Sequence, residues 1–217
     1  MPVFIFDMDG TLTDTNRIWR TYGVRFLQSK GIIAPDNSMA LAQTLGFAGY
    51  PQHLIDTYGL SETPDEIRAW TMEYITEQYK TASVKADALE FLQKAKAMGI
   101  RMCVATATDH YMTDPLLKRL GLWDYFEFVY TCGDFGTSKS RPDFFLRCCR
   151  DLRCPPEQAV IFEDAYYAIK PAKKAGLYVV GIAEETELYE DQVRQLSDQF
   201  VTRYAEIDFA KLPGGNA

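Results

Sequence analysis

Residues 3–11 read Val-Phe-Ile-Phe-Asp-Met-Asp-Gly-Thr, and this stretch decides the fold that the sequence predicts. Its apolar start indicates a short, buried strand, and two carboxylates, Asp7 and Asp9, follow where that strand ends. Side chains two positions apart on an extended segment project the same way, so both acids can reach one ion or one reacting group. Gly10 and Thr11 then predict a tight turn whose free backbone N–H groups can hold an anionic oxygen.

Composition limits the classes of protein that need to be considered. With 217 residues, 47% of them apolar, the chain can bury one core or a core plus a small accessory domain. A net charge of -7 argues against nucleic acid as a partner, because phosphate backbones are held by clustered Lys and Arg. No stretch approaches the ~20 apolar residues of a membrane span.

The cysteines and histidines limit the expected cellular location and the type of metal site. Five cysteines without C-x-x-C spacing fit reduced thiols, so we expect a cytoplasmic protein. The chain has two histidines, which excludes a His-rich zinc site. The expected binding chemistry therefore rests on carboxylates.

The pattern of apolar residues changes twice along the chain. Residues 15–80 have helical periodicity without a convincing strand, and Pro64 followed by two acids predicts the start of one of these helices. From residue 81 onward helices and strands alternate, which is typical of a parallel sheet with crossover helices. The expected later strands cover 100–105, 126–130, 159–162, 178–182 and 199–201, and the expected helices cover 88–98, 112–120, 144–152, 169–175 and 188–196.

These elements predict an α/β fold with two domains. The core is a doubly wound, Rossmann-like parallel sheet made from residues 1–14 and 81–217, and an all-helical domain of residues 15–80 is inserted after the first strand.

Polar side chains follow the expected strands, at the edge of the sheet where the strands end. They are Asp7 with Asp9, Thr106, Lys139, and Glu163 with Asp164. Each has an ordinary structural explanation as a helix cap, a surface lysine or a turn. Because the carboxyl ends of parallel strands meet at one edge, we expect these side chains to converge on one site.

Several acids with one lysine and one hydroxyl suggest a magnesium site that receives a phosphoryl group. Mg²⁺ prefers carboxylates, waters and phosphate oxygens, and it neutralises the charge that keeps an anionic ester away from an acidic protein. One Asp can attack phosphorus, and a second can protonate the leaving alcohol and then deprotonate water.

Four motifs in chain order carry a resemblance to a known family. They are Asp7-Met8-Asp9-Gly10-Thr11-Leu12-Thr13-Asp14, then Thr106, then Lys139 with Pro142-Asp143, and finally Phe162-Glu163-Asp164 with Ala175-Gly176. The chain resembles the haloacid dehalogenase superfamily, in its phosphatase and phosphomutase branch with a helical cap. Dehalogenases of the superfamily lack the second acid, Asp9, so phosphoryl chemistry is favoured over carbon–halogen cleavage.

The resemblance implies a role for each matching residue. Asp7 is the implied nucleophile and Asp9 the implied acid/base. The implied magnesium ligands are Asp7, Asp9 through its backbone carbonyl, Glu163 and Asp164. The implied phosphoryl-binding residues are Asp7, Gly10, Thr11, Thr106, Ala107 and Lys139.

The chain also departs from the family pattern. The fourth motif usually continues with Ser and then Gly, whereas Ala165-Tyr166-Tyr167-Ala168 stands here, and Pro171 is expected to delay or kink the following helix. A pair of bulky tyrosines beside the metal can reshape the substrate pocket. The His after the first motif and the cap Arg of similar sugar-phosphate mutases are missing.

We therefore expect a Mg²⁺-dependent phosphatase that acts, as a monomer, on a small phosphorylated metabolite. A sugar-phosphate mutase of the β-phosphoglucomutase type and a non-catalytic binding protein with the same fold are the alternatives. Candidates for contact with the rest of the substrate are Arg141, Tyr50 and Arg17.

Overall fold

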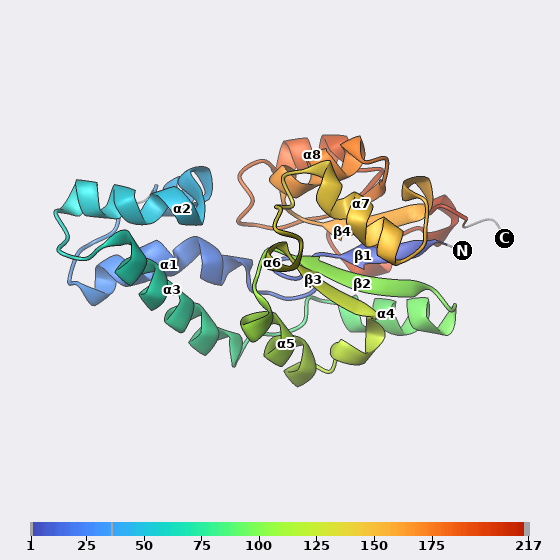
Figure 1. The fold of residues 1–217 in the computed structure, drawn as a ribbon, viewed down its shortest axis with the longest axis horizontal. Coiled ribbons are helices and arrows are strands. Elements are labelled where there is room, and N and C mark those ends of the chain that lie inside the picture. The colour runs from blue at the N-terminus through green and yellow to red at the C-terminus, as the bar shows by residue number, and fades with distance from the viewer. Residues whose placement is uncertain (1, 36, 215–217) are drawn as a thin grey trace. The chain divides into compact units, whose positions relative to one another are not determined.

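The computed structural model describes residues 2–35 and 37–214 and contains a six-stranded parallel sheet (Figure 1). The strands are β1 (Val3–Phe6), β2 (Arg101–Thr106), β3 (Phe128–Thr131), β4 (Ala159–Glu163), β5 (Tyr178–Ile182) and β6 (Gln199–Val201). Their order, β3-β2-β1-β4-β5-β6, is that of a doubly wound fold, in which the direction of winding reverses between β1 and β4. The predicted fold class is confirmed.

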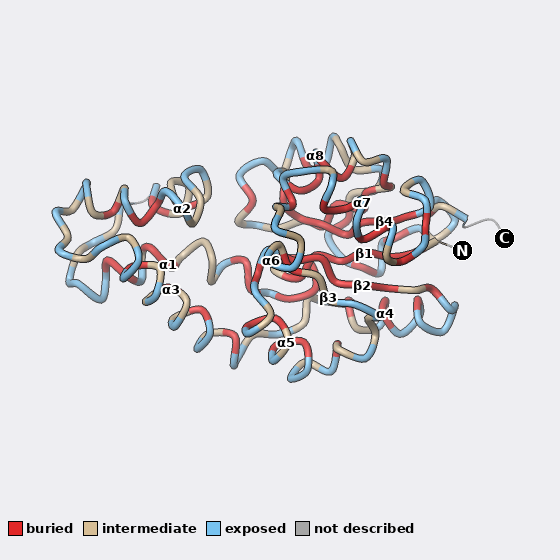
Figure 2. Tube along the Cα trace, viewed as in Figure 1, coloured by how far each residue is buried: buried red, intermediate tan, exposed pale blue. Residues whose placement is uncertain are grey.

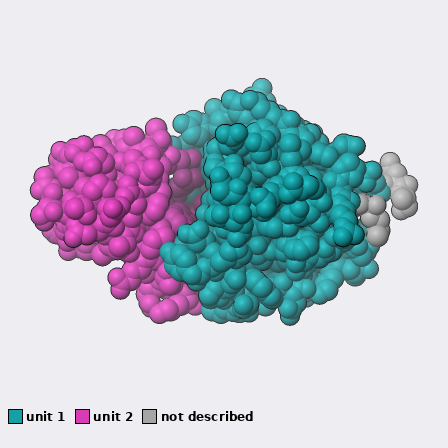
Figure 3. Space-filling model, viewed as in Figure 1, with its two compact units in different colours: residues 1–14, 83–217 teal, residues 15–82 magenta. Residues whose placement is uncertain are grey.

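The chain forms two compact units, which Figure 3 colours separately. Unit 1 comprises Met1–Asp14 and Ser83–Ala217 and contains the sheet. Unit 2 comprises Thr15–Ala82 and is helical, with α1 (Asn16–Ser29), α2 (Ser38–Tyr58) and α3 (Pro64–Tyr79).

The helices of unit 1 agree with the expected ones in type and differ mainly at their ends. They are α4 (Ala88–Ala97), α5 (His110–Arg119), α6 (Cys132–Phe135), α7 (Pro142–Asp151), α8 (Tyr166–Lys174) and α9 (Glu190–Leu196). The short α6 was not predicted. The expectation that Pro171 delays its helix is wrong, because α8 begins at Tyr166 and contains Pro171, whose missing N–H removes a single helical bond. The alternative, a kink at Pro171, stays a prediction.

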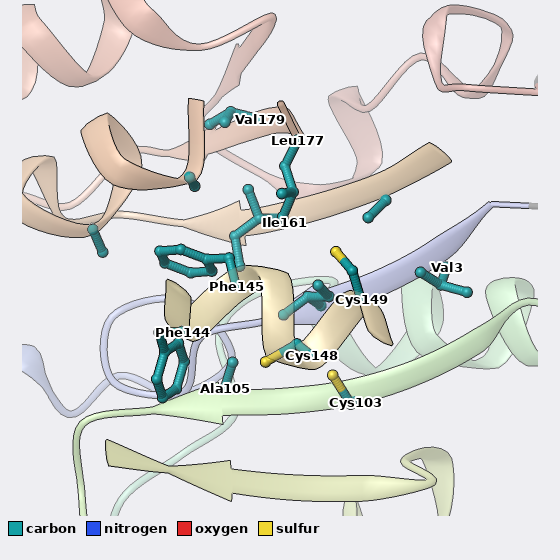
Figure 4. Packing of buried hydrophobic residues seen from close by; sticks show 14 of the residues in the cluster. Val3, Cys103, Ala105, Phe144, Phe145, Cys148, Cys149, Ile161, Leu177 and Val179 are labelled. Carbon is teal, nitrogen blue, oxygen red and sulfur yellow. The ribbon is translucent and has the colours of Figure 1, made fainter. Parts of the chain in front are cut away.

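The inner strands β1, β2, β4 and β5 are buried on both faces because each face carries its own apolar layer, whereas the edge strands β3 and β6 are partly exposed (Figure 2). On one face Val3 and Ile5 of β1 pack in a cluster with α7, and Figure 4 shows Phe145 and Cys149 of that helix among the side chains of the strands. Alternate residues of β1 project to the other face, where the rings of Phe4 and Phe91 stack 5.9 Å apart. These two layers fix β1 at the centre of the sheet, and with it the acids that follow.

Unit 2 has a separate aromatic core. Tyr50 of α2 is 1% exposed, and its ring lies 5.7 Å from that of Tyr22 in α1. Gly46, at φ 65°, interrupts α2, a backbone angle that glycine adopts without strain. The predicted start of a helix at Pro64 is confirmed, and a capping box formed by Thr63 and Glu66 fixes it.

Across residues 2–35 and 37–214, the helices are all too short or too polar to cross a lipid bilayer.

Candidate active site

The turn after β1 places Asp7 at the switch point of the sheet. The Asp7 N–H donates to the carbonyl of Phe162 in β4 at 2.9 Å, which holds the first acid beside the end of that strand. Gly10, at φ 87°, then turns the chain, and its N–H donates to the Thr13 carbonyl at 2.9 Å. The Thr11 N–H donates to the Met8 carbonyl at 3.3 Å.

The expectation of free N–H groups at Gly10 and Thr11 is therefore wrong. Both amides donate to carbonyl groups of the turn itself, so they are not available to bind an anion. The Thr11 hydroxyl is also engaged, since it donates to Asp164 Oδ1 at 2.8 Å. Thr11 thus ties the turn to the end of β4.

Lys139 is a buried cation held by two acids. Its ammonium forms ion pairs with Asp7 Oδ1 and, at 2.6 Å, with Glu163 Oε2, and its side chain is 0% exposed. Lys139 lies in the segment between α6 and α7, and the structure brings it to Asp7, which follows β1, and to Glu163, the last residue of β4. A buried lysine that keeps its charge requires such partners.

Three carboxylates meet within the range of one small ion. Asp7, Glu163 and Asp164 each offer an oxygen, these oxygens lie within 4.8 Å of one another, and all three residues are buried. Carboxylate oxygens are the ligands that Mg²⁺ prefers, and a divalent cation offsets their repulsion. The donor set therefore fits Mg²⁺. The Asp9 carboxylate is not part of this set, and the contribution of the Asp9 backbone carbonyl stays a prediction.

Burial and mutual repulsion disfavour the charged forms of these acids. Burial and Glu163 raise the pKa of Asp164 to about 8, against the hydrogen bond from Thr11. The pKa of Asp7 is also raised well above its ordinary value, first by burial and then by Glu163, although Lys139 acts in the opposite direction. Shifts of this kind, caused by burial together with specific charged partners, are typical of functional sites.

A second group of side chains surrounds Asp9. The Thr108 hydroxyl donates to Asp9 Oδ2 at 2.7 Å, and the Thr108 N–H donates to Thr106 Oγ1 at 3.1 Å. Since a hydroxyl has one proton and accepts at its lone pairs, Thr106 can still donate to a phosphoryl oxygen. Thr106 is 1% exposed at the end of β2, and Ala107 lies between the two threonines.

The remaining candidates lie outside this cluster. Arg141 is exposed and pairs with Asp143 at 3.2 Å. Arg17 is an exposed residue of α1, and Tyr50 belongs to the aromatic core of unit 2. Their contact with substrate stays a prediction.

Two polar contacts of the site were not anticipated from the sequence. Thr108 appeared only as part of a helix-capping pattern, yet its partner lies 99 positions earlier. Tyr204, near the end of the chain, donates from its hydroxyl to the Thr11 carbonyl at 3.2 Å. No local sequence pattern predicts either contact, because the two residues of each pair are far apart in the sequence and come together only in the folded protein.

A doubly wound sheet with buried carboxylates and a buried lysine at its switch point has its polar groups where α/β enzymes bind their ligands. The model of the haloacid dehalogenase-like hydrolases matches residues 1–176, so the chain belongs to this family, as the motifs predicted.

The alignments with known proteins of similar sequence or fold cover most of the chain. The validoxylamine A 7'-phosphate phosphatase of Streptomyces hygroscopicus subsp. limoneus is 28% identical over 83% of this chain and 84% of its own. The fructose-1-phosphate phosphatase of Escherichia coli (strain K12) is 28% identical over 82% of this chain and 94% of its own. Among solved structures, CbbY of Rhodobacter sphaeroides in complex with xylulose 1,5-bisphosphate superposes with a TM-score of 0.81. It is 21% identical and covers 98% of this chain and 99% of its own, which shows a shared fold.

Proposed function

We propose that this protein is a Mg²⁺-dependent phosphatase that hydrolyses a small phosphorylated metabolite through an aspartyl-phosphate formed on Asp7. The observation that carries the proposal is the buried group of Asp7, Lys139, Glu163 and Asp164 at the switch point. A site that buries three acids around one lysine is costly unless the charges serve a bound group. The relatives named as phosphatases of phosphorylated small molecules support the same substrate class.

Asp7 and Asp9 have different roles in the proposed reaction. Asp7 attacks the phosphorus atom, so an O–P bond forms on its carboxylate while the bond from phosphorus to the leaving oxygen breaks. Asp9, held by Thr108, gives its proton to that oxygen. Asp9 then takes a proton from the water that attacks the aspartyl-phosphate, which releases inorganic phosphate and restores Asp7.

Lys139 and Thr106 bind the transferred group. The ammonium and the hydroxyl donate to phosphoryl oxygens whose charge must be stabilised as the bonds change. Asp7, Glu163 and Asp164, with the Asp9 carbonyl, would hold Mg²⁺, which supplies further positive charge to the same oxygens when it is bound. Cytoplasmic location and a monomeric state remain part of the proposal.

The first test is release of phosphate from phenyl phosphate with MgCl₂ by the native protein and by Asp7→Asn. We expect turnover by the native protein and a loss of at least about a thousandfold in the variant, because the nucleophile is gone. Circular dichroism is the control for folding, and we expect the variant to keep its fold, since Glu163 remains as a partner of Lys139. Equal rates for the two proteins would refute the mechanism.

The mutase alternative predicts a different product. It would return the phosphoryl group to the substrate, so a hexose monophosphate would give a positional isomer and no inorganic phosphate. Phosphorus NMR of the reaction mixture distinguishes the two outcomes.

A further inference from the structure

Tyr204 is a buried residue that contacts both segments that carry the acids. It is the first residue of a short 3₁₀ helix, η3 (Tyr204–Glu206), and it is 2% exposed. Its ring stacks on that of Phe162 in β4, with 6.1 Å between the centroids, and its hydroxyl donates to the Thr11 carbonyl at 3.2 Å. The side chain therefore joins the strand that ends at Glu163 to the turn that follows β1.

The Thr11 carbonyl depends on this hydroxyl. The N–H groups of residues 11–13 all donate to the Met8 carbonyl, so the amides of the turn are satisfied within it. Among the described residues, Tyr204 alone donates to the carbonyl of Thr11, a residue that is 0% exposed. Leaving a buried carbonyl without a donor costs free energy, so we expect the turn to rearrange when the hydroxyl is removed.

Thr11 connects this contact to a carboxylate of the proposed magnesium site. Its hydroxyl donates to Asp164 Oδ1 at 2.8 Å, and Asp164 is one of the three acids that offer an oxygen to a single ion. Hydrogen bonds to a ligating carboxylate fix its orientation, and their loss weakens metal binding. Two hydrogen bonds, joined by Thr11, thus lead from Tyr204 to the acid group.

The segment around Tyr204 is itself held in place. Arg203 donates to both carboxylate oxygens of Asp87 at 2.8 Å. The N–H and the hydroxyl of Thr202 each donate to the Glu206 carboxylate at 2.8 Å. These contacts fix the chain on both sides of Tyr204, so its hydroxyl meets the turn from a defined position.

We infer that Tyr204 is a positioning residue of the proposed magnesium site, because its hydroxyl holds Thr11 and Thr11 orients the Asp164 carboxylate. This inference rests on the proposed function, which assigns Mg²⁺ to the acid group. The family model matches residues 1–176, so Tyr204 lies beyond the matched segment and beyond the four motifs of the sequence. In this role Tyr204 acts through Thr11 and does not touch the ion.

Tyr204→Phe tests the inference, because it keeps the ring and removes only the hydroxyl. Calorimetric titration with MgCl₂ measures Mg²⁺ binding by the native protein and the variant without any turnover. We expect the Kd for Mg²⁺ to rise about two- to tenfold, the range that corresponds to the net contribution of one hydrogen bond. In phosphate-release assays the MgCl₂ concentration at half-maximal rate should rise similarly, with a smaller change in kcat.

Thr11→Val shows whether the effect passes through Thr11. This variant removes the donor to Asp164, so its Kd for Mg²⁺ should rise at least as much as that of Tyr204→Phe. Adding Tyr204→Phe to Thr11→Val should then change the Kd by less than about twofold, because the connecting hydroxyl is already absent. An undiminished effect in the double variant would overturn the inference.

Tyr130→Phe is the matched control. The Tyr130 hydroxyl donates to Asp151 Oδ2 at 3.1 Å, but Asp151 is the last residue of α7 and belongs to neither acid-bearing segment. We expect this control to leave the Kd for Mg²⁺ unchanged. If Tyr204 had only a structural role, Tyr204→Phe would lower the urea midpoint and keep the magnesium affinity of the control, which would refute the inference.

Failure of this inference and failure of the proposed function give different results. Phosphate release with the same Kd for Mg²⁺ in the native protein and Tyr204→Phe would overturn the inference and leave the phosphatase proposal standing. A raised Kd in Tyr204→Phe, with no phosphate released by the native protein, would do the reverse. An equal rise in Tyr130→Phe, or absence of Mg²⁺ binding by the native protein, would also overturn the inference.

Discussion

Two networks of charged side chains lie at the ends of neighbouring strands, and they differ in their access to water. The buried network contains Asp7, Lys139, Glu163 and Asp164, and its lysine side chain is 0% exposed. The exposed network centres on His110, whose ring nitrogens each lie 2.9 Å from a carboxylate and whose side chain is 41% exposed.

The difference in burial predicts a difference in energy. Charges near the surface interact through a high effective dielectric constant and are screened by salt, so an exposed pair contributes about 0–1 kcal/mol. Removing one partner of a buried pair leaves a charge without compensation and costs about 3–5 kcal/mol. The buried network is therefore expected to control catalysis and folding, and the exposed network to tune stability slightly.

Among the variants that compare the two networks, Lys139→Met should give the largest effect. The variant leaves Asp7 and Glu163 without their cation, so we expect the free energy of unfolding to fall by about 3–5 kcal/mol. We also expect phosphate release to slow by about 100- to 1000-fold, since the phosphoryl oxygens lose a charged donor. Urea denaturation and a phosphate-release assay measure the two effects.

Lys173→Met is the matched control. Lys173 pairs with Asp198 at 2.7 Å, but these side chains are 33% and 31% exposed, so its loss should cost less than about 1 kcal/mol. Equal destabilisation by the two variants would contradict the distinction between buried and exposed charges.

Magnesium should stabilise the native protein through the buried network. A ligand that binds only the folded state adds about 2.7 kcal/mol at 100 times its Kd. We expect thermal unfolding to shift upward with MgCl₂ and the shift to vanish in Asp164→Asn, which loses one carboxylate of the group. Asp134→Asn, in the exposed network, should keep the shift; if both variants keep it, the ion binds elsewhere.

The sequence was informative about the fold because its patterns are local. The apolar run before Asp7 and the alternation of helices and strands after residue 81 predicted the parallel sheet, and the observed strand order agrees with it. The polar residues after the strands could be expected to converge, because parallel strands end at one edge. The Thr-x-x-Asp spacing of Thr131 and Asp134, a capping box, could have revealed α6.

Other features depend on partners that are distant in sequence or on how a turn closes. The bond from Thr108 to Asp9 joins two loops, and no spacing rule connects them. The amides of Gly10 and Thr11 were expected to be free, whereas the Thr13 and Met8 carbonyls of the same turn accept from them. Such satisfaction of polar groups becomes visible only in three dimensions.

Thr108→Val tests whether this unforeseen contact orients the proposed acid/base. The substitution keeps the shape and removes the donor to Asp9, so we expect kcat to fall by about tenfold with a smaller change in KM. Thr113→Val is the control, since its hydroxyl donates to the Thr108 carbonyl at 3.0 Å and supports the same loop without touching Asp9. An equal loss of kcat in both variants would assign the effect to the loop.

His110→Gln should give the smallest effect, and its sign follows from the pKa of the histidine. The hydrogen bond with Asp114 raises the pKa of His110 in the folded state; burial opposes this rise, and the interaction with Asp134 adds to it. In the unfolded chain the ordinary value is about 6.5, so the stabilisation is fully present below about pH 6.5 and is lost as pH rises through the raised pKa.

The difference in unfolding free energy between the native protein and His110→Gln should therefore depend on pH. We expect the native protein to exceed His110→Gln in unfolding free energy by less than about 1 kcal/mol at about pH 5.5, and by nearly nothing at about pH 9. Urea denaturation at both pH values measures this difference, and added salt should reduce it, because the side chain is 41% exposed. A difference that is large and constant over this pH range would mean that His110 stabilises the protein by packing. The difference in energy between the exposed and the buried network could then not be attributed to charge.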